Sequence, residues 1–262
     1  MAKKIFIPLF IFCFHFSFAQ DMSLFQKKVY HSTSGQDLNY RILYPENYNA
    51  AKKYPVLLFL HGSGERGDDN EKQLVHGATL FLDPVNREKY PAIVLFPQCP
   101  EGKSWASLDI RMGDDGKKMY VRNNGEVPGE MSVLLKELLQ DLAKSTKVDS
   151  KRFYIMGLSM GGFGTLEMLY LYPNTFAAAV PICGGHPIDL ASVYAKKLPI
   201  WLFHGAKDPV VPVYFSRDLY AKLQELGAEV KYTEFPEASH DSWTNTFATP
   251  ELLTWIFSHQ KK

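Results

Sequence analysis

The sequence has few cysteines and no excess of charge of either sign. Its 262 residues include three cysteines, too few to make disulfides the main support of a fold. Lysine and arginine together number 29, and aspartate and glutamate 28, so the charge balance predicts neither nucleic acid nor an anionic membrane as a partner. Hydrophobic residues make up 46% of the chain and charged residues 22%, a composition typical of a globular domain and unlike that of a disordered or fibrous protein.

Long apolar runs are also scarce, and the one at the N-terminus has the pattern of an export signal. Two lysines precede an apolar stretch over residues 5–14, and Ser17-Phe18-Ala19 supplies small residues at the positions that a signal peptidase reads. The stretch is too short for a membrane span. We therefore expect a signal peptide over residues 1–19, a single domain over residues 20–262, export to the periplasm or the medium, and no stable membrane association.

Export would expose the chain to an oxidising compartment. Two cysteines, Cys99 and Cys183, remain in the expected mature chain. Either a disulfide between them or two buried thiols is compatible with the sequence, and both alternatives stay open.

Short apolar runs alternate with amphipathic stretches along the rest of the chain. Such alternation predicts an α/β fold in one domain, with a mostly parallel sheet and helices on both faces. A segment over residues 105–129 is rich in Gly, Asp and Asn, and we expect a long loop there, near the strand ends where such sheets bind ligands. The expected strands are 29–32, 38–44, 55–60, 92–96, 153–158, 176–182, 200–203 and 230–235, and the expected helices are 131–142, 162–172, 214–226 and 250–258.

One serine has the sequence context of a nucleophile. The pentapeptide Gly157-Leu158-Ser159-Met160-Gly161 has the form G-x-S-x-G and lies between an expected strand and an expected helix. A sharp turn at this place strains the serine backbone and exposes its hydroxyl, and the flanking glycines leave room for the chain to double back. The sequence therefore predicts Ser159 as a nucleophile, the alternative being an ordinary glycine-rich turn.

A serine nucleophile needs a base. Four histidines follow Ser159, namely His186, His204, His240 and His259. His240 lies in a loop after the last expected strand, a place from which an imidazole reaches a serine at the strand ends. His204 closes a strand, and His259 lies near the chain end. We therefore predict His240 as the base, with a surface histidine as the alternative.

The base in turn needs a carboxylate that orients it. Asp208 follows the expected strand 200–203 in a turn that contains two prolines, so its carboxylate would be held near the strand ends. Asp189 lacks that setting, Asp218 falls on an exposed helix face, and Asp241 is too close to the base in sequence to reach its ring. Asp208 is the predicted acid, and the order serine, aspartate, histidine is that of α/β-hydrolases.

Two backbone amides are predicted to hold the oxyanion of a tetrahedral intermediate. One is the N–H of Met160, directly after the serine. The other is expected in the glycine-rich loop over residues 61–67, where the N–H of Ser63 is our choice and that of Gly64 the alternative.

Other side chains near these motifs have alternative readings. We expect His61 to act as a structural hydrogen-bonding group beneath the site. Glu65 and Arg66 either pair with each other or touch the substrate. Trp105 and Trp243 are candidates for the substrate wall, because aromatic faces suit sugar rings and hydroxycinnamoyl groups, and packing in the core is the alternative for each.

Five segments taken together resemble a known family. From about residue 56 to the C-terminus, the chain is similar to secreted α/β-hydrolase esterases of the phospholipase/carboxylesterase group, also labelled "predicted peptidase", close to carbohydrate esterase family 1. The resemblance matches the family's nucleophile to Ser159, its acid to Asp208 and its base to His240, in agreement with the assignment from the residues. The matching segments are 61–70, 97–100, 157–162, 203–208 and 240–243.

The resemblance implies an exported serine carboxylesterase that works through an acyl-enzyme and needs no metal or cofactor. Its implied substrates are small-molecule or polysaccharide-linked esters, with acetyl or feruloyl groups on plant polysaccharide as the favoured class. A serine peptidase of the prolyl-oligopeptidase type is the main alternative, and a lipase and a binding protein without catalysis are the others. Because the base must be neutral, we expect activity to fall below about pH 6.5, the ordinary pKa of histidine.

Overall fold

The computed structural model describes residues 21–49, 51–123, 125 and 127–261. The expected signal peptide over residues 1–19 lies outside the described residues. In the part of the chain that is described, no helix is both long and apolar enough to cross a bilayer.

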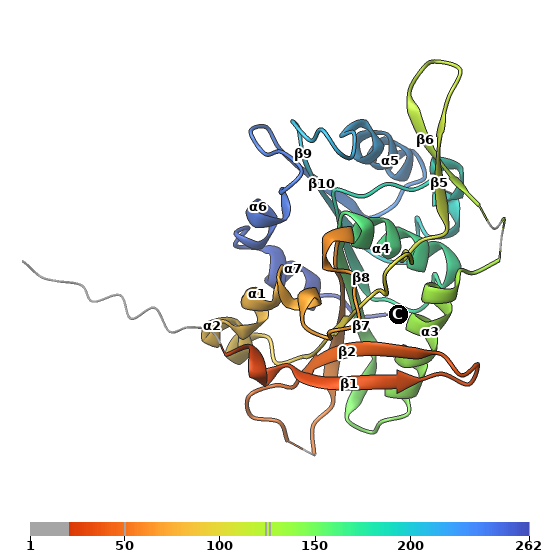
Figure 1. Cartoon of the computed structure of the whole chain (residues 1–262). Coiled ribbons are helices and arrows are strands. Elements are labelled where there is room, and N and C mark those ends of the chain that lie inside the picture. The colour runs from red at the N-terminus through yellow and green to blue at the C-terminus, as the bar shows by residue number, and fades with distance from the viewer. Residues whose placement is uncertain (1–20, 50, 124, 126, 262) are drawn as a thin grey trace, which may run out of the picture.

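One mixed sheet of eight strands forms the centre of the fold (Figure 1). Its strand order is β1-β2-β4-β3-β7-β8-β9-β10. The six neighbouring strands from β4 to β10 run parallel to one another, whereas β2 pairs antiparallel with both β1 and β4. Strands β3, β4, β8 and β9 consist of buried residues, which explains their continuous apolar sequences. The bounds are β1 Gln26–His31, β2 Asp37–Leu43, β3 Tyr54–Leu60, β4 Ile93–Pro97, β7 Val148–Leu158, β8 Ala178–Ile182, β9 Ile200–Gly205 and β10 Val230–Phe235.

Helices cover both faces of this sheet (Figure 1). One hydrophobic core lies between the sheet and α3 (Glu130–Ala143), α4 (Met160–Leu171) and α5 (Tyr214–Glu225). A second core lies between the other face and α1 (Ala78–Leu82) and α7 (Leu252–Phe257). The remaining helical elements of the described residues are α2 (Pro84–Lys89), α6 (Trp243–Phe247) and the short 3-10 segments η1 (Met22–Leu24), η2 (Ser63–Glu65), η3 (Lys72–Leu74) and η4 (Ile188–Val193).

This architecture confirms the predicted α/β fold with a mostly parallel sheet and helices on both faces. All eight expected strands and all four expected helices are present, although β7 begins five residues earlier than expected. The short helices α1, α2 and α6 were not expected, because each is too brief to show a full helical repeat in the sequence.

The expectation of a long loop over residues 105–129 was wrong. This segment forms a second, two-stranded antiparallel sheet of β5 (Leu108–Met112) and β6 (Lys118–Arg122). The hairpin projects from the body of the molecule at the upper right of Figure 1. Glycine and aspartate in its turn dominate the composition of the segment, and among its strands only β5 alternates apolar and polar residues.

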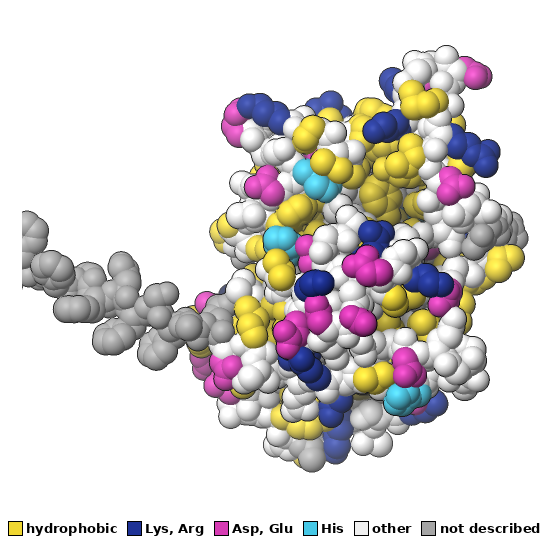
Figure 2. Space-filling model, in the orientation of Figure 1, with side chains coloured by type: hydrophobic (Ala, Val, Ile, Leu, Met, Phe, Trp, Pro, Cys, Tyr) yellow, Lys and Arg dark blue, Asp and Glu magenta, His cyan; other side chains and the backbone are white. Residues whose placement is uncertain are grey.

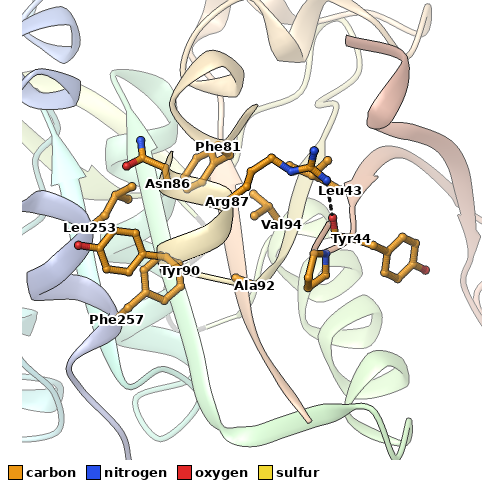
Figure 3. A pocket seen from close by; sticks show the side chains of 11 residues that line it. Leu43, Tyr44, Phe81, Asn86, Arg87, Tyr90, Ala92, Val94, Leu253 and Phe257 are labelled. Carbon is orange, nitrogen blue, oxygen red and sulfur yellow. Dashed lines mark hydrogen bonds between the residues drawn. The ribbon is translucent and has the colours of Figure 1, made fainter. Parts of the chain in front are cut away.

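A small hollow on the side of the sheet away from the hairpin is a packing feature. It lies between α2, α7 and the strands β2 and β4, and its volume is about 10 Å³, enough for one water (Figure 3). The side chain of Arg87 closes it by donating from Nη2 to the carbonyl oxygen of Tyr44 at 3.3 Å. None of the side chains predicted to act in catalysis lines this hollow.

Candidate active site

Ser159 occupies a strained turn between β7 and α4. Its φ is 52° and its ψ is −117°, a conformation that a residue with a Cβ adopts only when the surrounding structure enforces it. A Cβ on Gly161 would lie 1.9 Å from the carbonyl oxygen of Leu60, and one on Gly157 would lie 2.3 Å from that of Gly161. Because no side chain fits at either place, the two glycines of the motif permit this turn.

The structure brings Ser159, His240 and Asp208 into one hydrogen-bonded line. Asp208 follows β9, and His240 follows β10, so the carboxyl ends of parallel strands deliver all three residues to one edge of the sheet. His240 Nδ1 donates to Asp208 Oδ2 at 2.7 Å, because a carboxylate only accepts. Nε2 is thereby left to accept from Ser159 Oγ, 2.9 Å away. This is the geometry in which an imidazole removes a proton from a serine.

The carboxylate of Asp208 is fully buried and well supplied with donors. Oδ1 accepts from the amides of Val210 and Val211 at 2.8 and 2.9 Å, and Oδ2 lies 3.3 Å from Nε2 of the buried His204. Burial by itself disfavours the charged form, but these donors and His240 outweigh it and hold the pKa of Asp208 well below its ordinary value. Asp208 is therefore an anion throughout the neutral range.

The remaining histidines and aspartates lie in other settings. His204 is buried and donates from Nε2 to the carbonyl oxygen of Val211 at 2.9 Å, behind Asp208. His186 is buried beside Glu167, with 3.4 Å between Nε2 and Oε2. The three aspartates that were alternatives to Asp208 are exposed, namely Asp189, Asp218 and Asp241.

The two amides expected to hold an oxyanion both begin a helical segment. Met160 is the first residue of α4, and Ser63 is the first residue of η2, so neither N–H has an acceptor within its own helix. Gly62 and Ser159 are adjacent, since a Cβ on Gly62 would lie 3.7 Å from the Cβ of Ser159. The loop that carries Ser63 thus lies directly against the serine.

A buried histidine and a partly exposed arginine hold that loop in place. His61 donates from Nδ1 to the carbonyl oxygen of Gly62 at 2.6 Å and accepts at Nε2 from the amide of Cys99 at 2.9 Å. Arg66 donates from Nε to the carbonyl oxygen of Lys103 at 2.6 Å. The expectation that His61 is a structural hydrogen-bonding group beneath the site is confirmed.

The burial of His61 predicts that the folded protein loses stability in mild acid. Burial lowers its pKa from 6.5 to about 4, so below pH 6.5 the unfolded chain takes up a proton that the folded chain does not. We expect this histidine to contribute about 3 kcal/mol of stability at pH 7 that is lost as the pH falls towards 4. Urea unfolding of the wild type and His61→Gln at pH 7 and 4.5 measures it.

The control for this prediction is His31→Gln, at an exposed histidine. His31→Gln should keep the wild-type dependence of stability on pH, whereas His61→Gln should be less stable at pH 7 and depend less on pH. An unchanged pH dependence in His61→Gln would contradict the assignment.

The two tryptophans predicted to form a substrate wall have different positions. Trp105 is only 1% exposed, and its Nε1 donates to the carbonyl oxygen of His61 at 3.0 Å. It therefore supports the loop from below, and the prediction that it contacts substrate was wrong. Trp243 is partly exposed, and its ring lies 5.4 Å from the ring of His240, in an edge-to-face arrangement.

Glu65 and Arg66 do not pair with each other. Arg66 bonds to main-chain carbonyl groups, as described above, while Glu65 Oε1 lies 3.6 Å from Nε2 of His76. The sequence reasoning missed His76, because it lies between η3 and α1 and joins the site only through the tertiary fold.

A groove beside the projecting hairpin is lined by residues of β6, α5 and η4. Figure 2 shows hydrophobic side chains gathered in this hollow, whose volume is about 610 Å³. Tyr120 of β6 lines it, and its ring lies 4.5 Å from that of Phe163 on α4 and 4.4 Å from that of Phe215 on α5. Burial raises the pKa of Tyr120 to about 12, so its hydroxyl is neutral.

A buried ion pair attaches the hairpin to the helix behind the serine. Arg122 Nη2 of β6 lies 3.0 Å from Glu167 Oε1 of α4, and both side chains are almost wholly buried. The guanidinium also lies over the ring of Tyr170, 4.8 Å from its centroid. These contacts give the groove a fixed wall instead of a free loop.

The same edge of the sheet contains two unpaired cysteines and one set of potential metal ligands. Cys99 and Cys183 are both buried free thiols, so the disulfide alternative is not realised. Cys183, Asp208 and His240 place one ligand atom each within 4.8 Å of one another. Burial raises the pKa of the Cys183 thiol to about 12, and the other two groups are already bonded to each other. This donor set therefore fits a hydrogen-bonded site better than a metal centre.

Comparisons with known proteins agree on the type of protein. The family model described as Phospholipase/Carboxylesterase matches residues 47–250. A crystal structure of a thermostable esterase superposes with a TM-score of 0.81 and 35% identity, covering 91% of this chain and 64% of that one.

Two curated relatives each match more than half of the chain. A probable carboxylesterase of Oryza sativa subsp. japonica is 25% identical over 205 residues, which is 73% of this chain and 83% of the relative. A bifunctional acetylxylan esterase/xylanase of Neocallimastix patriciarum is 29% identical over 164 residues, 62% of this chain but only 20% of the relative.

The chain spans less than a quarter of the length of two curated relatives and 64% of the length of the thermostable esterase. The family match nevertheless covers most of the chain and contains the serine motif, the aspartate and the histidine that the fold brings together. The chain belongs to the phospholipase/carboxylesterase family of α/β-fold serine hydrolases.

Proposed function

We propose that this protein is a serine carboxylesterase that cleaves its substrate through an acyl-enzyme. The observation that carries the proposal is the hydrogen-bonded line from Ser159 Oγ through His240 to Asp208, with distances of 2.9 and 2.7 Å. Its setting on a strained strand-to-helix turn supports the same function, because such a turn leaves the hydroxyl free to attack.

In the proposed reaction, Ser159 Oγ attacks the ester carbonyl carbon while His240 Nε2 takes its proton. The N–H groups of Ser63 and Met160 hold the negative oxygen of the tetrahedral intermediate. His240 then gives the proton to the departing alcohol, and the acyl group remains on Ser159. Water, activated by the same imidazole, releases the acid and restores the serine. Asp208 keeps the imidazole in the correct tautomer and stabilises its charged form.

We propose esters on plant polysaccharide as the substrates, carrying acetyl or feruloyl groups. The mostly apolar groove between the hairpin and α5 is large enough for an aromatic acyl group, and the rings of Tyr120 and Phe215 that line it suit one. The acetylxylan esterase relative supports the class. We also propose that the signal peptide is cleaved after residue 19 and that the domain 20–262 is exported. Export would bring the domain to plant polysaccharides, which occur outside the cell.

Hydrolysis of p-nitrophenyl acetate by residues 20–262, compared with acyl-peptide p-nitroanilides, tests the proposed activity. Both substrates release a coloured product from the same triad chemistry, but an amide leaving group is harder to expel than an ester's alcohol. We expect rapid release of p-nitrophenol and little release of p-nitroaniline. Faster cleavage of the anilides would favour the peptidase, and cleavage of neither substrate would contradict both.

The proposed role of the Ser63 amide predicts the effect of removing a single N–H. Gly62 has a φ of −77° and a ψ of 179°, a conformation compatible with a following proline, and proline is tolerated at the first position of a helix. Ser63→Pro should therefore keep the loop while deleting the donor, and lower kcat for p-nitrophenyl acetate by about 100- to 1,000-fold.

Ser63→Ala is the matched variant, because it removes the hydroxyl and keeps the N–H. Its kcat is expected within about threefold of the wild type, since the proposed contact is through the backbone. An equal loss in both variants would assign the effect to the side chain and contradict the proposed oxyanion site.

A further inference from the structure

The carboxylate of Glu65 lacks a close partner although it lies in the candidate active site. Its side chain is only 12% exposed, and its neighbour His76 lies at 3.6 Å, beyond hydrogen-bonding distance. The adjacent Arg66 donates to main-chain carbonyl groups instead of to Glu65. A largely buried carboxylate without a donor is costly, so this group is suited to meet a donor on a ligand.

Glu65 lies close to the atoms that would react. A Cβ on Gly62 would be 3.0 Å from Glu65 Oε2 and 3.7 Å from the Cβ of Ser159, so the carboxylate and the serine flank the same backbone residue. Gly62 also precedes Ser63, whose amide is proposed to hold the oxyanion. A substrate held at Ser159 would therefore extend past Glu65.

Two aromatic rings connect Glu65 to the catalytic histidine. The ring of His76 lies 5.1 Å from that of Trp243, and Trp243 lies 5.4 Å from His240. The series Glu65, His76, Trp243, His240 thus runs from the oxyanion loop to the base along one side of the site. A carboxylate that accepts hydrogen bonds, beside an indole face, is the combination that binds a sugar or another polyol.

We propose that Glu65, His76 and Trp243 form a subsite for the alcohol part of the ester, in which Glu65 accepts a hydrogen bond from a free hydroxyl next to the esterified oxygen. This inference rests on the proposed esterase function and adds to it the residues that would select the alcohol part of the substrate. The apolar groove at the hairpin suits the mostly apolar acyl part, whereas a sugar carries several hydroxyl donors.

Two acetyl esters that differ only in those hydroxyls test the proposal. One is methyl 3-O-acetyl-β-xyloside, with its other hydroxyls free, and the other is the same ester with those hydroxyls methylated. A hydrogen bond to a charged acceptor predicts that the wild type prefers the free ester by about 10- to 100-fold in kcat/KM. In Glu65→Gln, kcat/KM should fall at least about tenfold more for the free ester than for p-nitrophenyl acetate.

The controls separate this inference from a structural role and from the proposed function. Glu88→Gln, at an exposed glutamate of α2, should leave both substrates unaffected. Equal losses of Glu65→Gln on all substrates would make Glu65 a structural residue and overturn the subsite, as would a wild type without preference for the free ester. No hydrolysis of p-nitrophenyl acetate by the wild type would instead contradict the esterase function itself.

A carboxylate also attracts cations, and an ester with a cationic alcohol part distinguishes this role from the binding of a hydroxyl. Acetylcholine and its neutral isostere 3,3-dimethylbutyl acetate have the same shape and differ in charge. The hydroxyl subsite predicts similar kcat/KM values for the two. A strong preference for acetylcholine that is lost in Glu65→Gln would assign Glu65 to a cation and overturn the proposal for a hydroxyl.

Discussion

Ser159→Ala is expected to lower kcat for p-nitrophenyl acetate by about 10⁶-fold, the scale on which other serine hydrolases lose activity without their nucleophile. The physical reason is that the acyl-enzyme route disappears, while the oxyanion amides and the binding site remain. His240 keeps its contact with Asp208 in this variant, since that hydrogen bond does not involve the serine. Steady-state kinetics of both proteins, purified in parallel, measure the ratio.

Two further observations make this result interpretable. Alanine keeps the Cβ and therefore the strained turn, so its urea midpoint should stay close to that of the wild type. A fluorophosphonate should add to the wild type at Ser159 and leave Ser159→Ala unlabelled. Equal p-nitrophenol release by the two proteins would show that Ser159 is not the nucleophile, and the proposed mechanism would fail.

The central fold was predictable because its strands are buried on both faces. β3 and β4 are continuous apolar runs, and a run of that length and composition favours a parallel strand. The hairpin of β5 and β6 gave no such signal, since most of its residues are exposed and no core selects its composition. Its position depends on Arg122 and Glu167, which are 45 positions apart and meet only in the folded chain.

The residues of the triad were predictable for a different reason. The elbow around Ser159 needs glycines at fixed spacing, and the loops that follow parallel strands meet at one edge of the sheet, which limits where an acid and a base can lie. The contacts around the triad were not predictable from the sequence. Trp105 was misassigned because an indole gives no sign in the sequence of which face it packs against, and the approach of His76 to Glu65 depends on the tertiary fold.

The residues around the triad divide the proposed site into two sides. The hairpin side is apolar and rigidly attached, through Tyr120 and Arg122, and the opposite side is polar and aromatic, through Glu65 and Trp243. The triad lies between them. An ester with an apolar acyl group and a hydroxylated alcohol matches this division, so selectivity and chemistry can be altered by separate substitutions.

The second large effect is expected from Asp208→Asn, which should lower kcat by about 10⁴-fold. The amides of Val210 and Val211 both donate to Oδ1, so the amide oxygen of the asparagine must take that place. Its NH2 group is then forced into the position of Oδ2, against Nδ1 of His240. An NH2 group donates, and Nδ1 must accept, which moves the imidazole proton to Nε2, where it faces Ser159.

An imidazole with its proton on Nε2 cannot remove the proton of Ser159, and this is why an isosteric change costs so much. Steady-state kinetics on p-nitrophenyl acetate, with NMR of the ring nitrogens, measure the rate and the tautomer together. Asp141→Asn, at an exposed position of α3, is the matched control and should leave both unchanged. A small loss of kcat with the proton still on Nδ1 would contradict the proposed role, because Asp208 would then contribute charge alone and the orientation of His240 would depend on other contacts.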